Sequence, residues 1–359
     1  MKRLLPAALV MVLMLASLAG CSSGPTVTKI GLGHVTSIAK STDLTTAADG
    51  KVTPPTAQVD TTFAVVAFDK DGKVVKASID TAQSKVAFDD KMQLTTDIKA
   101  EGKTKVELGD AYGLGKVSTI KKEWNQQIAE LEKWMVGKTV DQIKAMKTKQ
   151  RDASHTAVPD VPELTSLVTI TVEDYIKVVE EAWKNAVDVP KGVATLGLGH
   201  VISLASSKSY SMVDGKETLP VAQVDTTMAG VAFDKDGKVV RALIDTAQTK
   251  VNYDKNGKVT SDKTAAPQTK VELKDKYGMA AASSIKKEWY QQIAELEKWM
   301  AGKTVDQIKA MKTKQRDASH PNVPDVPELT SLVTITVQDY IKAVSEAKTN
   351  AKSVAPEKK

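Results

Sequence analysis

Runs of apolar and β-branched residues open each half of the chain. In the first half they are Ile30 to Val35, Thr61 to Phe68 and Lys73 to Ile79, and the last two are joined by Asp-Lys-Asp-Gly. A glycine-bearing loop between two β-branched runs is typical of a β-hairpin. The pattern therefore predicts strands at all three places, two of them paired as a hairpin.

Apolar residues then recur at spacings of three and four, which predicts amphipathic helices. One stripe ends before Gly137, and it consists of Ile120, Trp124, Ile128, Leu131 and Met135. Thr139 and Gln142 have the spacing of a capping box for a second helix. Thr171 and Asp174 have the same spacing before a third stripe, Tyr175, Val178, Val179, Ala182 and Trp183.

The charged stretch Lys105 to Leu108 between these halves is expected to be a strand that leads into a turn at Tyr112-Gly113. Strands come first and helices follow. This order indicates an α+β fold, an antiparallel sheet with C-terminal helices.

The whole arrangement occurs twice. Residues 163–175, ELTSLVTITVEDY, return as ELTSLVTITVQDY at residues 328–340, an offset of 165 (328 minus 163). Residues 121–155 and 286–320 differ at only two positions. Because each unit has the usual size of a domain, we expect two tandem domains, at 28–187 and 193–350, joined by a Pro/Gly-containing linker at 188–192 and followed by a basic tail at 351–359.

The N-terminus has the features of a targeting segment. Lys2 and Arg3 precede an apolar run from Leu4 to Leu18, so residues 1–20 are expected to be a signal peptide. Leu18-Ala19-Gly20-Cys21 resembles the lipobox of bacterial lipoproteins. That resemblance implies cleavage before Cys21, acylation of this residue, for example with palmitate, and a tether at 21–27 on the outer face of a bacterial cell membrane.

Composition narrows the choice of function. Cys21 is the only cysteine, which excludes an intramolecular disulfide and cysteine-rich metal sites. Without Lys2 and Arg3 the net charge falls from +6 to +4, because 48 basic residues then face 44 acidic ones. Basic and acidic residues alternate and aromatic residues are few, so nucleic acid is not an expected partner.

Candidate binding residues lie in the repeated threonine motif. Thr169 and Thr334 come just ahead of a predicted helix N-terminus, where unpaired N–H groups and the helix dipole suit an anion such as phosphate. The alternative is that these threonines only end a strand and cap a helix.

The four histidines occupy two equivalent positions in each repeat, which gives the pairs His34/His200 and His155/His320. In Gly-Leu-Gly-His the glycines allow a close approach to the backbone, so His34 and His200 are candidates for contact with a cofactor or a metal. The alternative is a strand-end histidine with satisfied hydrogen bonds. His155 and His320 lie in polar loops without a catalytic-metal motif, and neither half contains a phosphate loop or a nucleophile elbow.

Taken together, the unit resembles the FMN-binding domain of bacterial flavin-carrying lipoproteins. The motifs are Thr104 to Leu108 with Tyr112-Gly113, Gly137 to Asp141, and Leu164 to Thr171, with their second copies between Thr269 and Thr336. In that family a flavin transferase links FMN by a phosphoester to the last threonine of D-G-x-[ST]-G-A-T. Here Leu-Val stands in place of Gly-Ala.

The resemblance implies covalent FMN at Thr169 and Thr334, with Thr171 and Thr336 as the other candidate acceptors. It adds Ser166, Ser331, Tyr112, Tyr277, His34 and His200 as cofactor-binding residues. The expected function is then an extracytoplasmic electron carrier, not a self-contained catalyst, which accepts electrons from a membrane dehydrogenase or quinol. Noncovalent FMN is an alternative form of the same function. The rival expectation is a flavin-free surface lipoprotein that acts as a binding or structural module, and a haem or metal carrier that uses His34 and His200 is the third.

Overall fold

The computed structural model describes residues 26–355. The expected signal peptide, the lipidation site Cys21 and residues 356–359 lie outside this range. Among the described residues, no helix is both long enough and apolar enough to span a bilayer.

The first repeat builds a four-stranded antiparallel sheet with the order β5-β4-β1-β8. Its strands are β1 (Lys29–Ser37), β4 (Thr56–Phe68), β5 (Val74–Ala87) and β8 (Val187–Asp188). The predicted hairpin is confirmed: in the turn between β4 and β5, the Asp69 N–H donates to the Lys73 carbonyl. Both hairpin strands are longer than the apolar runs that predicted them.

The second repeat builds the matching sheet, with the order β13-β12-β9-β16. Its strands are β9 (Thr195–Ser203), β12 (Val221–Phe233), β13 (Val239–Asn252) and β16 (Lys352–Ser353). Strand β16 belongs to the stretch expected to be a basic tail, yet it pairs with Leu196 and Thr195 of β9. The paired part of that stretch is therefore an edge strand of the second sheet.

Helices follow the sheet in each repeat. In the first they are α1 (Lys105–Leu108), η1 (Gly109–Tyr112), α2 (Leu114–Val117), α3 (Trp124–Met135), α4 (Val140–Lys144) and α5 (Glu173–Lys184). In the second they are α6 (Lys270–Leu273), η2 (Lys274–Tyr277), η3 (Met279–Ala281), α7 (Trp289–Met300), α8 (Val305–Lys309) and α9 (Gln338–Thr349). The predicted capping box of Thr139 and Gln142 is present at the start of α4.

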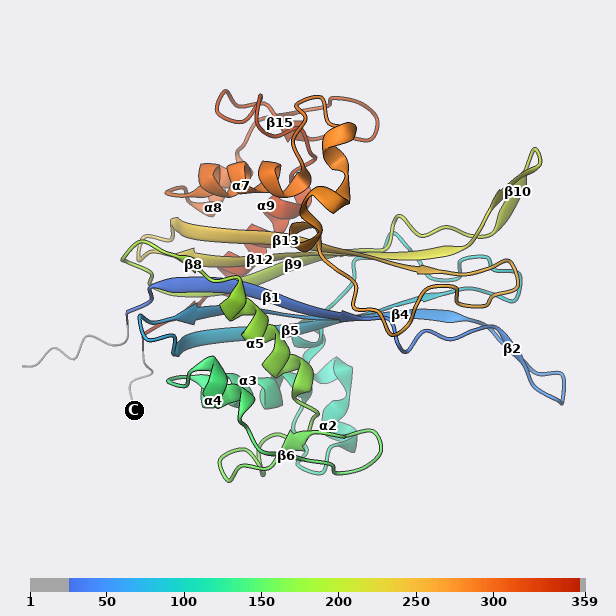
Figure 1. The fold of residues 1–359 in the computed structure, drawn as a ribbon, viewed down its shortest axis with the longest axis horizontal. Coiled ribbons are helices and arrows are strands. Elements are labelled where there is room, and N and C mark those ends of the chain that lie inside the picture. The colour runs from blue at the N-terminus through green and yellow to red at the C-terminus, as the bar shows by residue number, and fades with distance from the viewer. Residues whose placement is uncertain (1–25, 356–359) are drawn as a thin grey trace, which may run out of the picture.

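Short strand pairs complete the chain. They are β2 (Thr45–Thr46) with β3 (Val52–Thr53), β6 (Thr148–Lys149) with β7 (Val158–Pro159), β10 (Ser211–Val213) with β11 (Lys216–Thr218), and β14 (Thr313–Lys314) with β15 (Val323–Pro324). The β2/β3 and β10/β11 hairpins project from the end of the molecule opposite the described C-terminal residues (Figure 1).

The two sheets pack face to face, and the helices cover their outer faces (Figure 1). Strand β4 has apolar residues on both of its faces, which accounts for this layering. Phe63, Val65 and Ala67 point into a core shared by both repeats, whereas Ala64, Val66 and Phe68 point into the core under α3, α4 and α5. Because alternate residues of a strand face opposite sides, an unbroken apolar run can be buried on both faces.

The mixed fold with antiparallel sheets and helices agrees with the expectation. The expected division into two separate tandem domains is not confirmed. The core between the sheets takes residues from both repeats, among them Ile30, Phe63, Leu196 and Met228. The repeats therefore share one hydrophobic core in addition to the core that each has beneath its own helices.

Two local predictions are wrong, and side-chain hydrogen bonds explain one of them. Lys105 to Leu108 form a helical turn and not a strand, because Thr104 and Glu107 make a reciprocal capping box at its start. Helix α5 has Val172 as its N-cap with no side-chain cap, and the buried Thr171 hydroxyl has no hydrogen-bond partner. Thr171 and Asp174 thus match the spacing of a capping box without forming one.

Candidate functional site

The threonine motif is a turn that is tied to helix α3. Thr169 donates from both its N–H and its Oγ1 to Oε1 of Gln127, at 2.8 and 3.2 Å. Arg151 donates to the Thr169 carbonyl at 2.8 Å. Thr334 makes the same bonds to Gln292 and Arg316. Gln127 and Gln292 are fully buried, so they hold each threonine firmly against the domain core.

A phosphoester-linked flavin would replace contacts that each threonine already makes. Val168, which replaces the small residue of the family motif, is buried in the core with Leu164. Ser166 and Ser331 are exposed in the same turns. Two cavities among residues 26–355, of about 270 and 40 Å³, include no residue of the threonine motif in their linings. A phosphoester at Thr169 or Thr334 would remove the hydrogen bond that the hydroxyl donates to the buried glutamine.

Tyr112 and Tyr277 are half-buried at the ends of the short helices η1 and η2. The ammonium group of Lys105 lies 4.9 Å from the ring centre of Tyr112, and that of Lys270 lies 5.1 Å from the ring centre of Tyr277. Such cation–π contacts stabilise the packing of the helical segment. The structure does not bring either tyrosine together with the threonine motif in the contacts it describes.

His34 lies on β1, and its neighbouring glycines serve the packing of α5. A Cβ atom on Gly31 would be 1.7 Å from the Ala182 carbonyl oxygen, and one on Gly33 would be 2.1 Å from the Val178 carbonyl oxygen. The second repeat shows the same close approach of α9 to Gly197 and Gly199. The glycines thus allow a helix, and not a ligand, to pack closely on the strand backbone. This packing places a glutamate of the helix beside the histidine.

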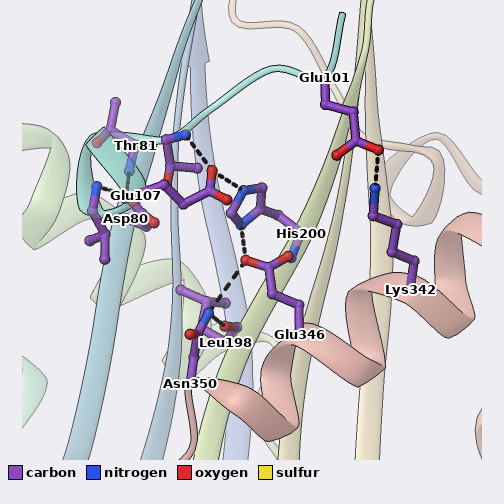
Figure 2. A network of polar contacts seen from close by, with 11 residues as sticks. Asp80, Thr81, Glu101, Glu107, Leu198, His200, Lys342, Glu346 and Asn350 are labelled. Atoms are coloured by element: carbon purple, nitrogen blue, oxygen red, sulfur yellow. Dashed lines mark hydrogen bonds and ion pairs between the residues drawn. The ribbon is translucent and has the colours of Figure 1, made fainter. Parts of the chain in front are cut away.

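Each histidine lies between two carboxylates, one from each repeat. His34 Nδ1 is 3.1 Å from Glu181 on α5, and its Nε2 is 3.5 Å from Glu272 on α6 of the other repeat. His200 Nδ1 is 3.1 Å from Glu346 on α9, and its Nε2 is 3.1 Å from Glu107 on α1 of the other repeat. Figure 2 shows the imidazole of His200 between these two carboxylates.

The backbone fixes the glutamate on the long helix in each cluster. The N–H of His34 donates to Glu181 Oε2 at 3.1 Å, and the N–H of His200 donates to Glu346 Oε2 at 2.9 Å. The carboxylate from the other repeat is more exposed, with 34% of the Glu272 side chain and 40% of the Glu107 side chain accessible. Each cluster therefore combines a buried imidazole, a carboxylate held by the strand backbone and a more exposed carboxylate held by the capping box of its own helix.

A further carboxyl group lies near each histidine. Burial raises the pKa of Asp80, which faces the charge of His200, to about 6, and it raises the pKa of Asp245, which faces His34, to about 6. Burial alone would lower the pKa of His34, but its hydrogen bond to Glu181 and the surrounding carboxylates raise it. The His34 site therefore favours positive charge.

Sequence analysis identified both histidines but missed Glu107, Glu181, Glu272 and Glu346. One signal was available: every member of one cluster has a counterpart in the other, because these glutamates and histidines occur in both repeats. The contact of each histidine with a glutamate of the opposite repeat had no local signal in the sequence, because it depends on how the two sheets stack. His155 and His320 instead bind Asp152 and Asp317 of their own loops, at 2.7 Å.

The larger cavity also joins the repeats. It has a volume of about 270 Å³ and is lined by residues of both, including Asp80, Glu132, Asn350 and Lys352. Its volume is below the range of about 300–1,000 Å³ that small-molecule sites occupy. The smaller cavity, about 40 Å³, is lined by His200, Glu107 and Glu346.

Comparisons with protein-family models, with curated proteins and with solved structures find no match to this chain. The resemblance to FMN-binding lipoproteins thus stays a prediction from the sequence motifs. The same holds for the lipid anchor at Cys21, the location outside the cell membrane, and the flavin transferase and electron donor as partners.

Proposed function

We propose that this chain is a flavin-free, lipid-anchored extracytoplasmic protein that acts as a binding module made from two joined repeats. The observation that carries the proposal is the binding of both motif threonines to buried glutamines. The N–H and hydroxyl groups of Thr169 and Thr334 donate to Gln127 and Gln292. A flavin phosphate would need these same threonine groups. Electron transfer through FMN is the second candidate, and the repeated threonine motif favours it.

The binding surface is expected where the repeats meet. The polar groups that converge there come from both repeats, and they include the two histidine clusters and the cavity that contains Glu132 and Lys352. A site of this kind exists only when the two sheets are stacked. This explains why a binding module would keep two copies of one unit in a single chain.

The anchor is proposed from the N-terminal sequence alone. Lys2, Arg3, the apolar run and Cys21 together suit export followed by lipidation. The partner at that end is then membrane lipid. The mild positive charge of the mature chain suits a position near anionic lipid or wall polymer.

Intact-mass spectrometry of the protein from its native membrane tests the proposal. The expected result is a mass increased by acylation at Cys21, with no FMN phosphoryl addition on peptides that span residues 161–177 and 326–342. The purified protein should also be colourless. An addition that maps to Thr169 or Thr334, and that Thr169→Ala or Thr334→Ala removes, would instead establish the flavin carrier.

A further inference from the structure

The two histidine clusters have the composition of metal sites. Each brings together one imidazole and two carboxylates whose nearest ligand atoms lie within 4.8 Å of one another: His34, Glu181 and Glu272 in one, and His200, Glu346 and Glu107 in the other. Imidazole nitrogen and carboxylate oxygen are both common ligands of zinc and related divalent ions.

Distances within each cluster suit a shared ion. Two ligands about 2.1 Å from one tetrahedral ion are about 3.4 Å apart. In each cluster Nδ1 of the histidine and the glutamate of the same repeat have about this spacing, at 3.1 Å. The glutamate of the other repeat lies nearest Nε2, on the opposite edge of the ring, at 3.5 Å for Glu272 and 3.1 Å for Glu107. Glu272 and Glu107 must shift to the same edge of the ring as the other glutamate, and each then gives up its capping bond to Thr269 or Thr104. The shift is short, because the ligand atoms of each cluster already lie within 4.8 Å of one another.

Charge balance also calls for a cation. Two carboxylates face one imidazole, which carries at most one positive charge. The lysine that lines the His200 cavity, Lys342, is already paired with Glu101, as Figure 2 shows. A divalent ion would neutralise the two glutamates of each cluster without needing a protonated histidine.

The His200 cluster also has space for an ion. The cavity lined by His200, Glu107 and Glu346 measures about 40 Å³. About 10–15 Å³ of such volume is enough for one water molecule. An ion and a water molecule that completes its coordination therefore fit there.

We propose that each cluster binds one divalent transition-metal ion of the zinc class, and that the ion links the two repeats because its ligands come from both. The inference rests on the proposed binding module and names its ligand. Each ion takes one nitrogen from the histidine, one oxygen from the glutamate of the same repeat and one oxygen from the glutamate of the other repeat. Water fills the remaining position.

Metal analysis of the full chain tests this proposal. After removal of metals with a chelator, the chain is dialysed against Zn²⁺, and in parallel against Co²⁺, whose visible absorption reports the ligand geometry. We expect two ions per chain, one in His200→Gln or His34→Gln, and none in the double variant. Glu107→Gln and Glu272→Gln, which alter partly exposed side chains, should weaken binding at one site at least tenfold.

The matched control is the loop pair His155→Asn and His320→Asn. These histidines also lie beside an aspartate but have a single carboxylate partner, so the control should still bind two ions. Circular dichroism confirms that each variant is folded.

Failure to bind at millimolar Zn²⁺, or a stoichiometry unchanged in the double histidine variant, would overturn the proposal. Loss of both ions in the loop control would do the same. The intact mass of the same sample reports flavin independently, so absence of metal with no flavin rejects the ion site and leaves the flavin-free module standing.

Discussion

Two equivalent glutamates beneath the sheets have different electrostatic surroundings. Glu132 Oε1 accepts from the Ile79 N–H at 2.7 Å, and Glu297 Oε1 accepts from the Ile244 N–H at 2.6 Å. Lys352 reaches to 3.5 Å from Glu132, whereas Glu297 has no lysine contact among the described ion pairs. Burial raises the pKa of both groups. The pKa of Glu297 reaches about 8, although the hydrogen bond from the Ile244 N–H and the charge of Arg241 act to lower it.

This difference predicts a pH-dependent effect of Glu297→Gln. The folded pKa of about 8 exceeds the ordinary value of 4.5, so the neutral acid is favoured on folding. The protonated carboxyl of Glu297 therefore contributes its full stabilisation below pH 4.5. This stabilisation, about 5 kcal/mol at most, is lost as the pH rises from 4.5 to about 8. The neutral amide should therefore stabilise the protein at pH 8 and change little at pH 4.5, as measured by urea unfolding at the two pH values.

Glu132→Gln in the first repeat is the matched control. Lys352 stabilises the ionised form of Glu132, so removal of the charge should gain much less at pH 8. Equal gains from the two substitutions would show that Lys352 does not compensate for the buried charge.

Single residues were predicted well from sequence where the cause is local. The capping box at Thr139 and the buried stripe of Tyr175, Val178 and Ala182 needed only spacing. The capping box of Thr104 and Glu107 was equally local, yet the charged stretch was assigned to a strand. Partners such as Gln127 for Thr169, 42 residues apart, could not be predicted, because they depend on tertiary packing.

At the scale of elements, the contact between β1 and α5 decides where the histidine cluster forms. The helix backbone lies directly on Gly31 and Gly33, so that Glu181 reaches both the ring and the N–H of His34. The sequence showed the glycines and the helix separately. The residues in contact are separated by almost the whole length of the repeat. Periodicity could not predict the contact, because the apolar face of the helix could have packed on any apolar surface.

Gly33→Ala tests this contact. The added Cβ would lie 2.1 Å from the Val178 carbonyl oxygen, so α5 must move away from the strand. We expect a loss of about 1–3 kcal/mol in the free energy of unfolding, typical of overpacking, measured by urea unfolding.

Gly50→Ala is the control, because no heavy atom lies within 4 Å of its added Cβ. It should cost about 1–2 kcal/mol, for its positive φ of 84° alone. An equally small loss for Gly33→Ala would mean that the helix does not need the close approach.

At the scale of the whole molecule, equivalent positions of the two repeats meet across the shared core. Val65 and Gly230 correspond at the offset of 165 (230 minus 65), and a Cβ on Gly230 would be 2.6 Å from Val65 Cγ2. Met92 and Gly257 are related in the same way, with the added Cβ 3.0 Å from the Met92 sulfur. The first repeat thus supplies the large residue and the second supplies the glycine at both places.

This complementarity was beyond sequence analysis. The sequence predicted two separate tandem domains, because nothing in either copy shows which face of its sheet is covered by the other. Apolar residues on both faces of β4 were present in the sequence, but a second covering layer has no periodic signature of its own. The differences between the copies become meaningful only once the sheets are stacked.

An exchange of Val65 and Gly230 tests whether the sheets are stacked in this way. Gly230→Val alone should lower the free energy of unfolding by about 1–3 kcal/mol through the clash with Val65, and Val65→Gly alone should lower it by leaving a cavity. The double variant restores one large and one small residue at the contact. It should therefore be more stable than the sum of the single losses predicts, by about 1 kcal/mol or more in a double-mutant cycle. If the repeats were separate domains, the two losses would add to within about 0.5 kcal/mol, since distant sites act independently.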